Sequence, residues 1–231
     1  MIEGRTQNAP WMGRATLNTW RAEARPLYRW SKRALDLALA LVGLVLLAPV
    51  LAAIAIAIKW DSPGPVIFAQ ERVGKDGRLF TLYKFRSMVH NHGKEEAHRA
   101  YARDFVNGHH RQDGVFKPSN GDVVTRVGRF LRKSSLDELP QLWNILKGEM
   151  SFVGPRPLVA AEMEAAAPWQ RRRLEAMPGL TGLVQVSGRS SLTFEKIARL
   201  DIYYVENCSL RLDLKIMLKT IPAVISGEST C

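Results

Sequence analysis

The chain is organised around one stretch, Leu131-Arg132-Lys133-Ser134-Ser135-Leu136-Asp137-Glu138-Leu139-Pro140-Gln141-Leu142-Trp143. It sets two adjacent carboxylates, Asp137 and Glu138, after a run of cations and at the start of an expected helix. A helix over residues 126–133 would place four cations on one face, Arg126, Arg129, Arg132 and Lys133, and leave Val127, Phe130 and Leu131 for packing. Cations, free helix N-terminal amides and an acidic pair together suit a phosphorylated ligand held with a divalent metal.

The acidic pair also has a purely structural interpretation. Ser135 and Glu138 fit the S-x-x-E capping box, and acids are common in the first turn of a helix. Pro140 argues against the full box, because it would be the fifth helical residue, where a missing N–H breaks a backbone bond. The local sequence therefore leaves a structural cap and a functional pair both open.

Composition limits the class of protein. The 231 residues carry a net charge of +11 and a pI of about 10.0, which favours anionic partners: nucleic acid, lipid headgroups or phosphorylated substrates. Two cysteines, Cys208 and Cys231, are too few for a disulfide framework, so we expect a reducing, cytoplasmic setting for the soluble part. No P-loop and no Asp-x-Asp metal motif occurs.

Residues 34–58 form the one strongly apolar segment, with Asp36 as its single charge. As a straight helix it would span about 37 Å, enough to cross a hydrocarbon core of about 30 Å. However, Pro49 lies near its middle, and both flanks are basic, against the positive-inside tendency. We therefore favour a re-entrant helix–break–helix hairpin over a single membrane span, and a buried soluble helix least.

The rest of the chain predicts an α+β, membrane-associated protein with three parts. Residues 1–30 are a basic, aromatic tail, residues 31–60 the hairpin, and residues 61–227 a small, mostly helical catalytic domain with short strands. Strands are expected at 66–74 and 79–86, and another within 178–189. Helices are expected at 141–146, 160–176, 194–207 and 212–225. Residues 89–124, which hold all five histidines, are a variable insert without a metal site.

A loop between two prolines carries a further candidate residue. In Gly154-Pro155-Arg156-Pro157 the prolines restrict the backbone around Arg156, so its guanidinium is held ready for a phosphate or carboxylate. The alternative is an arginine that ties down a turn. Lys84 and Arg86 alternate with Tyr83 and Phe85, which gives the second strand a basic side.

Together these motifs resemble the bacterial sugar transferase family, the monotopic polyprenyl-phosphate phosphoglycosyl transferases. The resemblance rests on four segments in order, Lys84–Met88, Ser135–Leu142, Met150–Leu158, and Pro178–Gly182 with Ser187-Gly188-Arg189. It runs from about Lys32 to Gly227 and only loosely covers residues 89–124. It looks closest to the galactose- or glucose-1-phosphate transferases of exopolysaccharide synthesis.

The resemblance implies an enzyme that transfers a sugar 1-phosphate from a UDP-sugar to undecaprenyl phosphate with Mg²⁺, releasing UMP. It implies Asp137 as nucleophile, through an aspartyl-phosphosugar intermediate, and Glu138 as its partner, both near the metal. It implies Arg132 for the polyprenyl phosphate and Arg156 for the nucleotide, and the break at Pro49. The remaining candidate substrate-binding residues are Pro155, Pro157, Arg189, Lys84 and Arg86. The catalytic domain would face the cytoplasm on the bacterial inner membrane, with membrane lipid as partner and room for a homodimer.

Two positions depart from the family pattern, and one other class of protein competes. Ala48 precedes Pro49 where better-known members have Ser, and Val184 stands where many hexose-transferring relatives carry Trp. A membrane-tethered nucleic-acid-binding or structural protein would explain the charge, but it would not explain the acidic pair inside the basic face. We therefore expect no nucleic-acid partner.

Overall fold

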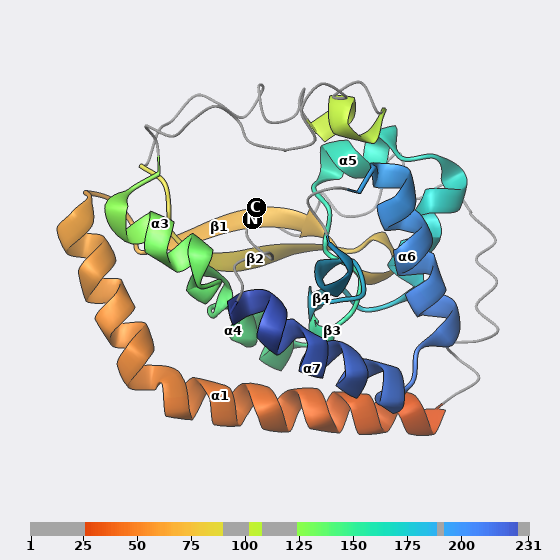
Figure 1. Ribbon diagram of the computed structural model, residues 1–231, viewed down its shortest axis with the longest axis horizontal. Coiled ribbons are helices and arrows are strands. Elements are labelled where there is room, and N and C mark those ends of the chain that lie inside the picture. The colour runs from red at the N-terminus through yellow and green to blue at the C-terminus, as the bar shows by residue number, and fades with distance from the viewer. Residues whose placement is uncertain (1–25, 90–101, 108–123, 189–191, 226–231) are drawn as a thin grey trace, which may run out of the picture.

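A long apolar helix, α1 (Pro26–Asp61), runs along one side of the protein and bends part of the way along its length (Figure 1). The computed structural model describes residues 26–89, 102–107, 124–188 and 192–225. Pro49 lies inside α1, where its ring and its missing N–H disturb the helical hydrogen bonds. The sequence predicted two helices with a break between them, whereas the structure has one continuous, bent helix.

Each arm of α1 packs against a different part of the domain. We call the part of α1 before Pro49 its first arm and the part after Pro49 its second arm. Ala40 on the first arm packs in a cluster with Leu142 and Ile145. Ile54 and Ile58 on the second arm pack with Phe85 and Leu131. Other apolar side chains of α1 point away from the domain: Val45 and Leu46 are 66% and 72% exposed. By length and composition α1 could cross a membrane.

The strands form two small sheets, so the fold is mixed but mostly helical. Strands β1 (Ile67–Val73) and β2 (Leu79–Phe85) pair antiparallel around a 3₁₀ turn at Lys75–Gly77, which confirms the predicted hairpin. Strands β3 (Ser151–Val153) and β4 (Gly179–Thr181) pair in parallel. The third predicted strand is therefore short, and residues Gln185–Ser187 after it form a 3₁₀ turn.

The other helices surround these sheets (Figure 1). They are α3 (Arg126–Lys133), α4 (Gln141–Lys147), α5 (Ala160–Ala165), α6 (Phe194–Asn207) and α7 (Leu210–Ile225). The helix predicted at 160–176 is divided, because Pro168 starts a separate 3₁₀ segment, Pro168–Glu175. The predicted helices at 141–146, 194–207 and 212–225 are confirmed, the last with an earlier start.

Polar contacts fix both ends of α1 to the same domain. Near its start, Lys32 forms an ion pair with the buried Asp213 of α7 at 2.9 Å. The single charge of the apolar segment, Asp36, accepts a hydrogen bond from the backbone N–H of Phe152 in β3 at 3.0 Å. At the other end, Asp61 accepts from the backbone N–H of Val127 at the start of α3, also at 3.0 Å. Both ends of the apolar helix are thereby held by one folded unit.

Candidate active site

The acidic pair lies in a tight turn between two helices. Helix α3 begins after Thr125, whose hydroxyl accepts from the N–H of Gly128 at 2.9 Å, and ends at Lys133. Ser135 then adopts a left-handed conformation, φ 56°, which is costly for a residue other than glycine and directs the chain into a 3₁₀ turn, η4 (Leu136–Glu138). The strained residue thus directly precedes the acidic pair.

This geometry corrects two expectations. Asp137 and Glu138 precede α4 by a turn instead of beginning it, because Pro140 is the residue that caps α4. The Ser135 side chain makes no capping hydrogen bond, so the capping-box interpretation is wrong. On α3, Leu131 packs as expected, but Phe130 is 64% exposed and lies beside the second arm of α1.

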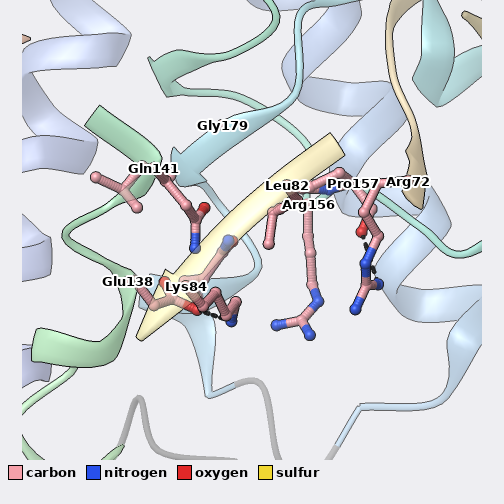
Figure 2. Close-up of a pocket in the computed structure, with 10 residues that line it drawn as sticks. Arg72, Leu82, Lys84, Glu138, Gln141, Arg156, Pro157 and Gly179 are labelled. Carbon is pink, nitrogen blue, oxygen red and sulfur yellow. Dashed lines mark hydrogen bonds and ion pairs between the residues drawn. The ribbon is translucent and has the colours of Figure 1, made fainter. Parts of the chain in front are cut away.

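Glu138 lines a cationic pocket that lies between the β1–β2 hairpin and the loop after β3 (Figure 2). The residues that line it are Arg72, Leu82, Lys84, Glu138, Gln141, Arg156, Pro157, Gly179, Leu180 and Gln185. Three of them are cations and one is a carboxylate. Such an excess of positive charge in a partly enclosed pocket favours an anionic ligand.

Lys84 and Glu138 are the closest charged pair in the pocket. The Lys84 ammonium donates to the Glu138 carboxylate, Nζ to Oε1, at 2.6 Å. Burial alone would raise the pKa of Glu138, but Lys84, Arg156 and Arg72 together hold that pKa below its ordinary value. Glu138 is therefore ionised at neutral pH, and its negative charge partly neutralises the positive charge of Lys84.

Asp137 behaves differently, although it is the next residue. Burial raises the pKa of Asp137 to about 6, and the charge of Glu138 adds to this effect, while Lys84 and Arg132 oppose it. Among the described residues, the Asp137 carboxylate makes no hydrogen bond or ion pair with another side chain. It is thus a partly buried carboxylate beside the pocket, mostly ionised at pH 7, whose one hydrogen bond in the described part of the chain is to its own backbone N–H.

The loop that carries Arg156 is held through its backbone at four successive carbonyl groups. The carbonyls of Pro155 and Leu158 accept from the backbone N–H groups of Gly179 and Val73, at 2.9 and 2.8 Å. The carbonyl of Arg156 accepts from Arg173 at 3.1 Å and that of Pro157 from Arg72 at 3.3 Å. The Arg156 side chain itself has no partner among the described residues, so a fixed loop presents a free guanidinium to the pocket.

The close approach of this loop to β4 requires glycine. A Cβ atom at Gly154 would lie 2.1 Å from the carbonyl oxygen of Met177, and one at Gly179 would lie 2.1 Å from the backbone nitrogen of Gly154. Either contact is too close for a real side chain. The glycines at these positions therefore allow the parallel pairing that places Pro155 and Arg156 at the pocket.

The structure separates the predicted site residues into two groups. Lys84, Glu138, Arg156 and Pro157 line the pocket, with Asp137 beside it and Pro155 in the loop behind. Arg132 does not line the pocket, but it is near enough to Asp137 to lower the pKa of that carboxyl.

Arg86 is not among the residues that line the pocket. Arg86 is 5% exposed and donates to backbone carbonyls after α1, those of Pro63 and Ser62, the latter at 2.7 Å. This contact network ties the end of α1 to β2, so the placement of Arg86 favours a structural role instead of substrate binding. Arg189 lies outside the described residues, as do the five histidines of the 89–124 insert.

Sequence reasoning missed three polar residues of the pocket, Arg72, Gln141 and Gln185, and its apolar lining, Leu82, Gly179 and Leu180. The strand register gives a signal for the first: Phe68 pairs with Lys84 and Arg72 pairs with Phe80, so Arg72 and Lys84 lie on the same face of the hairpin. Gln141 follows the acidic turn by three residues and is only 3% exposed. No sequence pattern distinguishes Gln185, whose position depends on the β4 chain path.

The arrangement suits attack by a carboxylate on a phosphoryl group. Lys84, Arg156 and Arg72 would neutralise phosphate oxygens that otherwise repel the attacking anion. A hard divalent cation prefers oxygen ligands, and one or two carboxylates with substrate phosphates are a common set for Mg²⁺. Asp137 and the Glu138 oxygen not bound to Lys84 fit such a set, and among the described residues no cluster of three metal-binding side chains offers another.

Comparison with known proteins identifies the family of the chain. The family model for bacterial sugar transferases matches residues 27–227. The chain is 46% identical over 200 residues to a UDP-galactose-lipid carrier transferase of Erwinia amylovora, and 41% identical to the undecaprenyl-phosphate galactose phosphotransferase of Salmonella typhimurium. Each match covers 87% of this chain and 41% of the relative, so the chain spans about two fifths of the length of these proteins.

A shorter relative is matched along most of its length. The exopolysaccharide production protein ExoY of Rhizobium meliloti is 40% identical over 200 residues, which are 87% of this chain and 88% of ExoY. Because the family model covers residues 27–227, it includes the apolar helix, the acidic turn and the Arg156 loop. The chain belongs to the bacterial sugar transferase family.

Proposed function

We propose that the protein transfers a sugar 1-phosphate from a UDP-sugar, with galactose or glucose as the sugar, to undecaprenyl phosphate, as a membrane step of exopolysaccharide assembly. The observation that carries this proposal is a partly buried carboxylate, Asp137, which makes no side-chain hydrogen bond or ion pair with the described residues and lies beside a pocket lined by Lys84, Arg156 and Arg72. The names of the relatives supply the substrates: UDP-galactose-lipid carrier transferase, and UDP-glucose:undecaprenyl-phosphate glucose-1-phosphate transferase of Caulobacter vibrioides, 41% identical.

The reaction would proceed in two displacements at the same phosphorus atom. In the first, a carboxylate oxygen of Asp137 attacks the sugar-bearing phosphorus of the UDP-sugar, the bond to the bridging oxygen breaks, and UMP leaves. In the second, a phosphate oxygen of undecaprenyl phosphate attacks the aspartyl-phosphosugar and displaces the Asp137 carboxylate. The product is undecaprenyl-diphosphate-sugar, and the enzyme returns to its starting state.

Side chains around the turn would assist both steps by charge. Lys84 and Arg156 face the pocket and would bind the phosphate oxygens of the nucleotide, which must be neutralised before an anion can attack. Arg132 is not among the lining residues but is near enough to lower the pKa of Asp137, and it would hold the phosphate of the lipid. Glu138, ionised and bound to Lys84, would keep that ammonium oriented.

Mg²⁺ is the expected metal, held by Asp137 and Glu138 together with phosphate oxygens. When bound there it would neutralise charge on the phosphoryl group and favour departure of UMP. It would also hold Asp137 ionised, against the burial that raises the pKa of this carboxyl.

We further propose that α1 enters and leaves the membrane on the same side, with the catalytic domain on the cytoplasmic face of the inner membrane. Lys32 near one end and Asp61 at the other are both bound to the same domain, by Asp213 and by the N–H of Val127. A helix that crossed the bilayer would separate these ends by about 30 Å of hydrocarbon. The exposed apolar side chains between them, Val45 and Leu46 among these, would lie in lipid.

The test is UMP release by detergent- or nanodisc-held protein with Mg²⁺, undecaprenyl phosphate and a panel of UDP-sugars. We expect release with UDP-galactose or UDP-glucose that is lost in Asp137→Asn and kept in Asp76→Asn, an exposed acid of the hairpin turn that serves as matched control. No UMP from any donor with folded protein would contradict the proposal. Salt-dependent DNA binding that survives Asp137→Asn would instead favour the nucleic-acid alternative.

A further inference from the structure

Arg72, one of the three cations of the pocket, lies in the pocket wall with Arg156 (Figure 2). A buried arginine in a structural role normally faces a carboxylate. Here two guanidinium groups share one pocket with Lys84, and the single lining carboxylate, Glu138, is already bound to that lysine. Among the described lining residues, the charge of one carboxylate therefore balances only part of the charge of three cations.

The contacts of Arg72 are with neutral oxygens. One terminal nitrogen donates to the Gln70 side chain at 2.6 Å and the other to the carbonyl of Pro157 at 3.3 Å, while Nε is buried and has no partner among the described residues. Burial and the charge of Arg156 together lower the pKa of Arg72 to about 10, while the charges of Glu162 and Glu138 oppose this shift. These contacts orient the guanidinium but do not neutralise it.

Two other donors in the same wall have no partner among the described residues. The Arg156 guanidinium makes no hydrogen bond or ion pair. Gln141 is 3% exposed, and its buried side-chain nitrogen has no hydrogen-bond acceptor. A buried amide without a partner is costly unless a ligand completes its bonds. Figure 2 shows the Arg72 and Arg156 side chains alongside each other with their guanidinium groups pointing the same way.

We propose that Arg72 and Arg156 form a two-arginine clamp for a diphosphate group, with the Gln141 amide as a further donor. The inference rests on the proposed function, in which the donor substrate carries such a group. Arginine binds phosphate through two parallel N–H donors, so two adjacent arginines match two linked phosphoryl groups better than one. The hydrogen bond from Arg72 to Pro157 also fixes the spacing between the two arginines, because Pro157 directly follows Arg156.

A purely structural role for Arg72 would predict something different. If Arg72 only supported the Arg156 loop through Pro157, its loss would weaken every anionic ligand to the same extent and would lower the stability of the fold. A clamp instead discriminates between one and two phosphoryl groups. The ratio of the affinity for a diphosphate to the affinity for a single phosphate therefore separates these two roles.

The experiment measures binding of inorganic pyrophosphate and of inorganic phosphate by calorimetry, with detergent-held protein and EDTA to exclude metal. The variants are Arg72→Met, Arg72→Lys and the control Arg78→Met, which removes the same charge from an exposed position of the same hairpin. We expect the preference of the wild type for pyrophosphate to fall by about tenfold in Arg72→Met and to persist in Arg78→Met. Arg72→Lys keeps the positive charge but lacks the paired N–H donors of a guanidinium, so it should also lose most of the preference for pyrophosphate.

Three results would overturn the clamp: no pyrophosphate preference in the wild type, an unchanged preference in Arg72→Met, or an equal loss in the Arg78→Met control. If Arg72→Met fails to fold, the Arg72→Lys result decides. The outcome does not depend on turnover. UMP release with an unchanged preference in Arg72→Met would remove the clamp and leave the proposed function, whereas a lost preference without UMP release from any donor would do the reverse.

Discussion

At the scale of single residues, the two adjacent carboxylates are separated by their surroundings into different roles. Glu138 faces Lys84 at 2.6 Å, and its pKa lies below the ordinary value despite burial. Asp137 is partly buried and makes no side-chain hydrogen bond or ion pair with the described residues, and its pKa rises to about 6. A carboxylate that is not bound by an ammonium keeps more of its nucleophilicity than one that is, so the electrostatics favour Asp137 for attack and Glu138 for support.

The raised pKa of Asp137 predicts a stability cost that appears as pH rises. Between about pH 4 and pH 6 the folded protein keeps the Asp137 proton while the unfolded chain loses it, so the free energy of unfolding falls across this window. Asp137→Asn should remove that slope and, above pH 7 without metal, stabilise the protein by about 1–2 kcal/mol. Thermal unfolding in detergent from pH 4 to pH 8 measures this. Equal slopes in the variant and the wild type would contradict it.

Lys84 should set the pH at which the nucleophile ionises. Its positive charge lowers the pKa of Asp137, against burial, so Lys84→Met should raise this pKa above about 6. The ionised carboxylate is the attacking form, and the acidic limb of the kcat–pH profile should therefore move to higher pH. Lys75→Met, in the hairpin turn outside the pocket, is the control. A lower kcat with an unmoved midpoint would assign Lys84 to binding alone.

At the scale of elements, two features make the site rigid: the Arg156 loop and the docking of α1. The loop carbonyls of Pro155, Arg156, Pro157 and Leu158 are all bound, so only the Arg156 side chain is left to respond to a ligand. The first arm of α1 is tied to β3, the strand that leads into this loop, by Asp36 and the N–H of Phe152. Helix α1 and the Arg156 loop are thus connected through one short strand.

Asp36 should therefore matter as a hydrogen-bond acceptor more than as a charge. Asp36→Ala leaves the Phe152 N–H without a partner and should cost about 1–3 kcal/mol, which is a fall of several degrees in Tm for a domain of this size. Asp36→Asn keeps an acceptor oxygen and should lose much less. Melting curves of both variants in the same detergent provide the comparison. Equal loss in the two variants would show that the negative charge, and not the hydrogen bond, holds β3 to α1.

At the scale of the whole molecule, the sequence predicted the helices and strands better than the contacts between them. The β1–β2 hairpin follows from alternation around Lys75-Asp76-Gly77, and α6 from its own periodicity, because both signals are local. Local sequence did not place Arg72 beside Arg156, since that contact depends on how the hairpin packs on the loop after β3. Local sequence also could not show that Arg86 would donate its hydrogen bonds to backbone carbonyls after α1, or that Phe130 would face away from the core.

The placement of α1 in the membrane gives a prediction for the whole molecule. In a variant with Cys208 and Cys231 replaced by serine, single cysteines at the exposed residues Trp30 and Trp60 should both react with an impermeant maleimide from the same side of the membrane. A cysteine at the exposed Arg78 marks the side of the catalytic domain, and one at Leu46 should be protected from both sides. Labelling of positions 30 and 60 from opposite sides would show that α1 crosses the bilayer.

The central claim is that Asp137 carries the phosphosugar before the lipid acceptor takes part. The most direct measurement is exchange of labelled UMP into the UDP-sugar with Mg²⁺ and without undecaprenyl phosphate. The two-step account predicts exchange in the wild type and none in Asp137→Asn, because the first displacement is reversible and needs only the nucleophile and the donor. Absence of exchange in a wild-type preparation that turns over when undecaprenyl phosphate is added would contradict the covalent step and favour direct transfer between the two bound substrates.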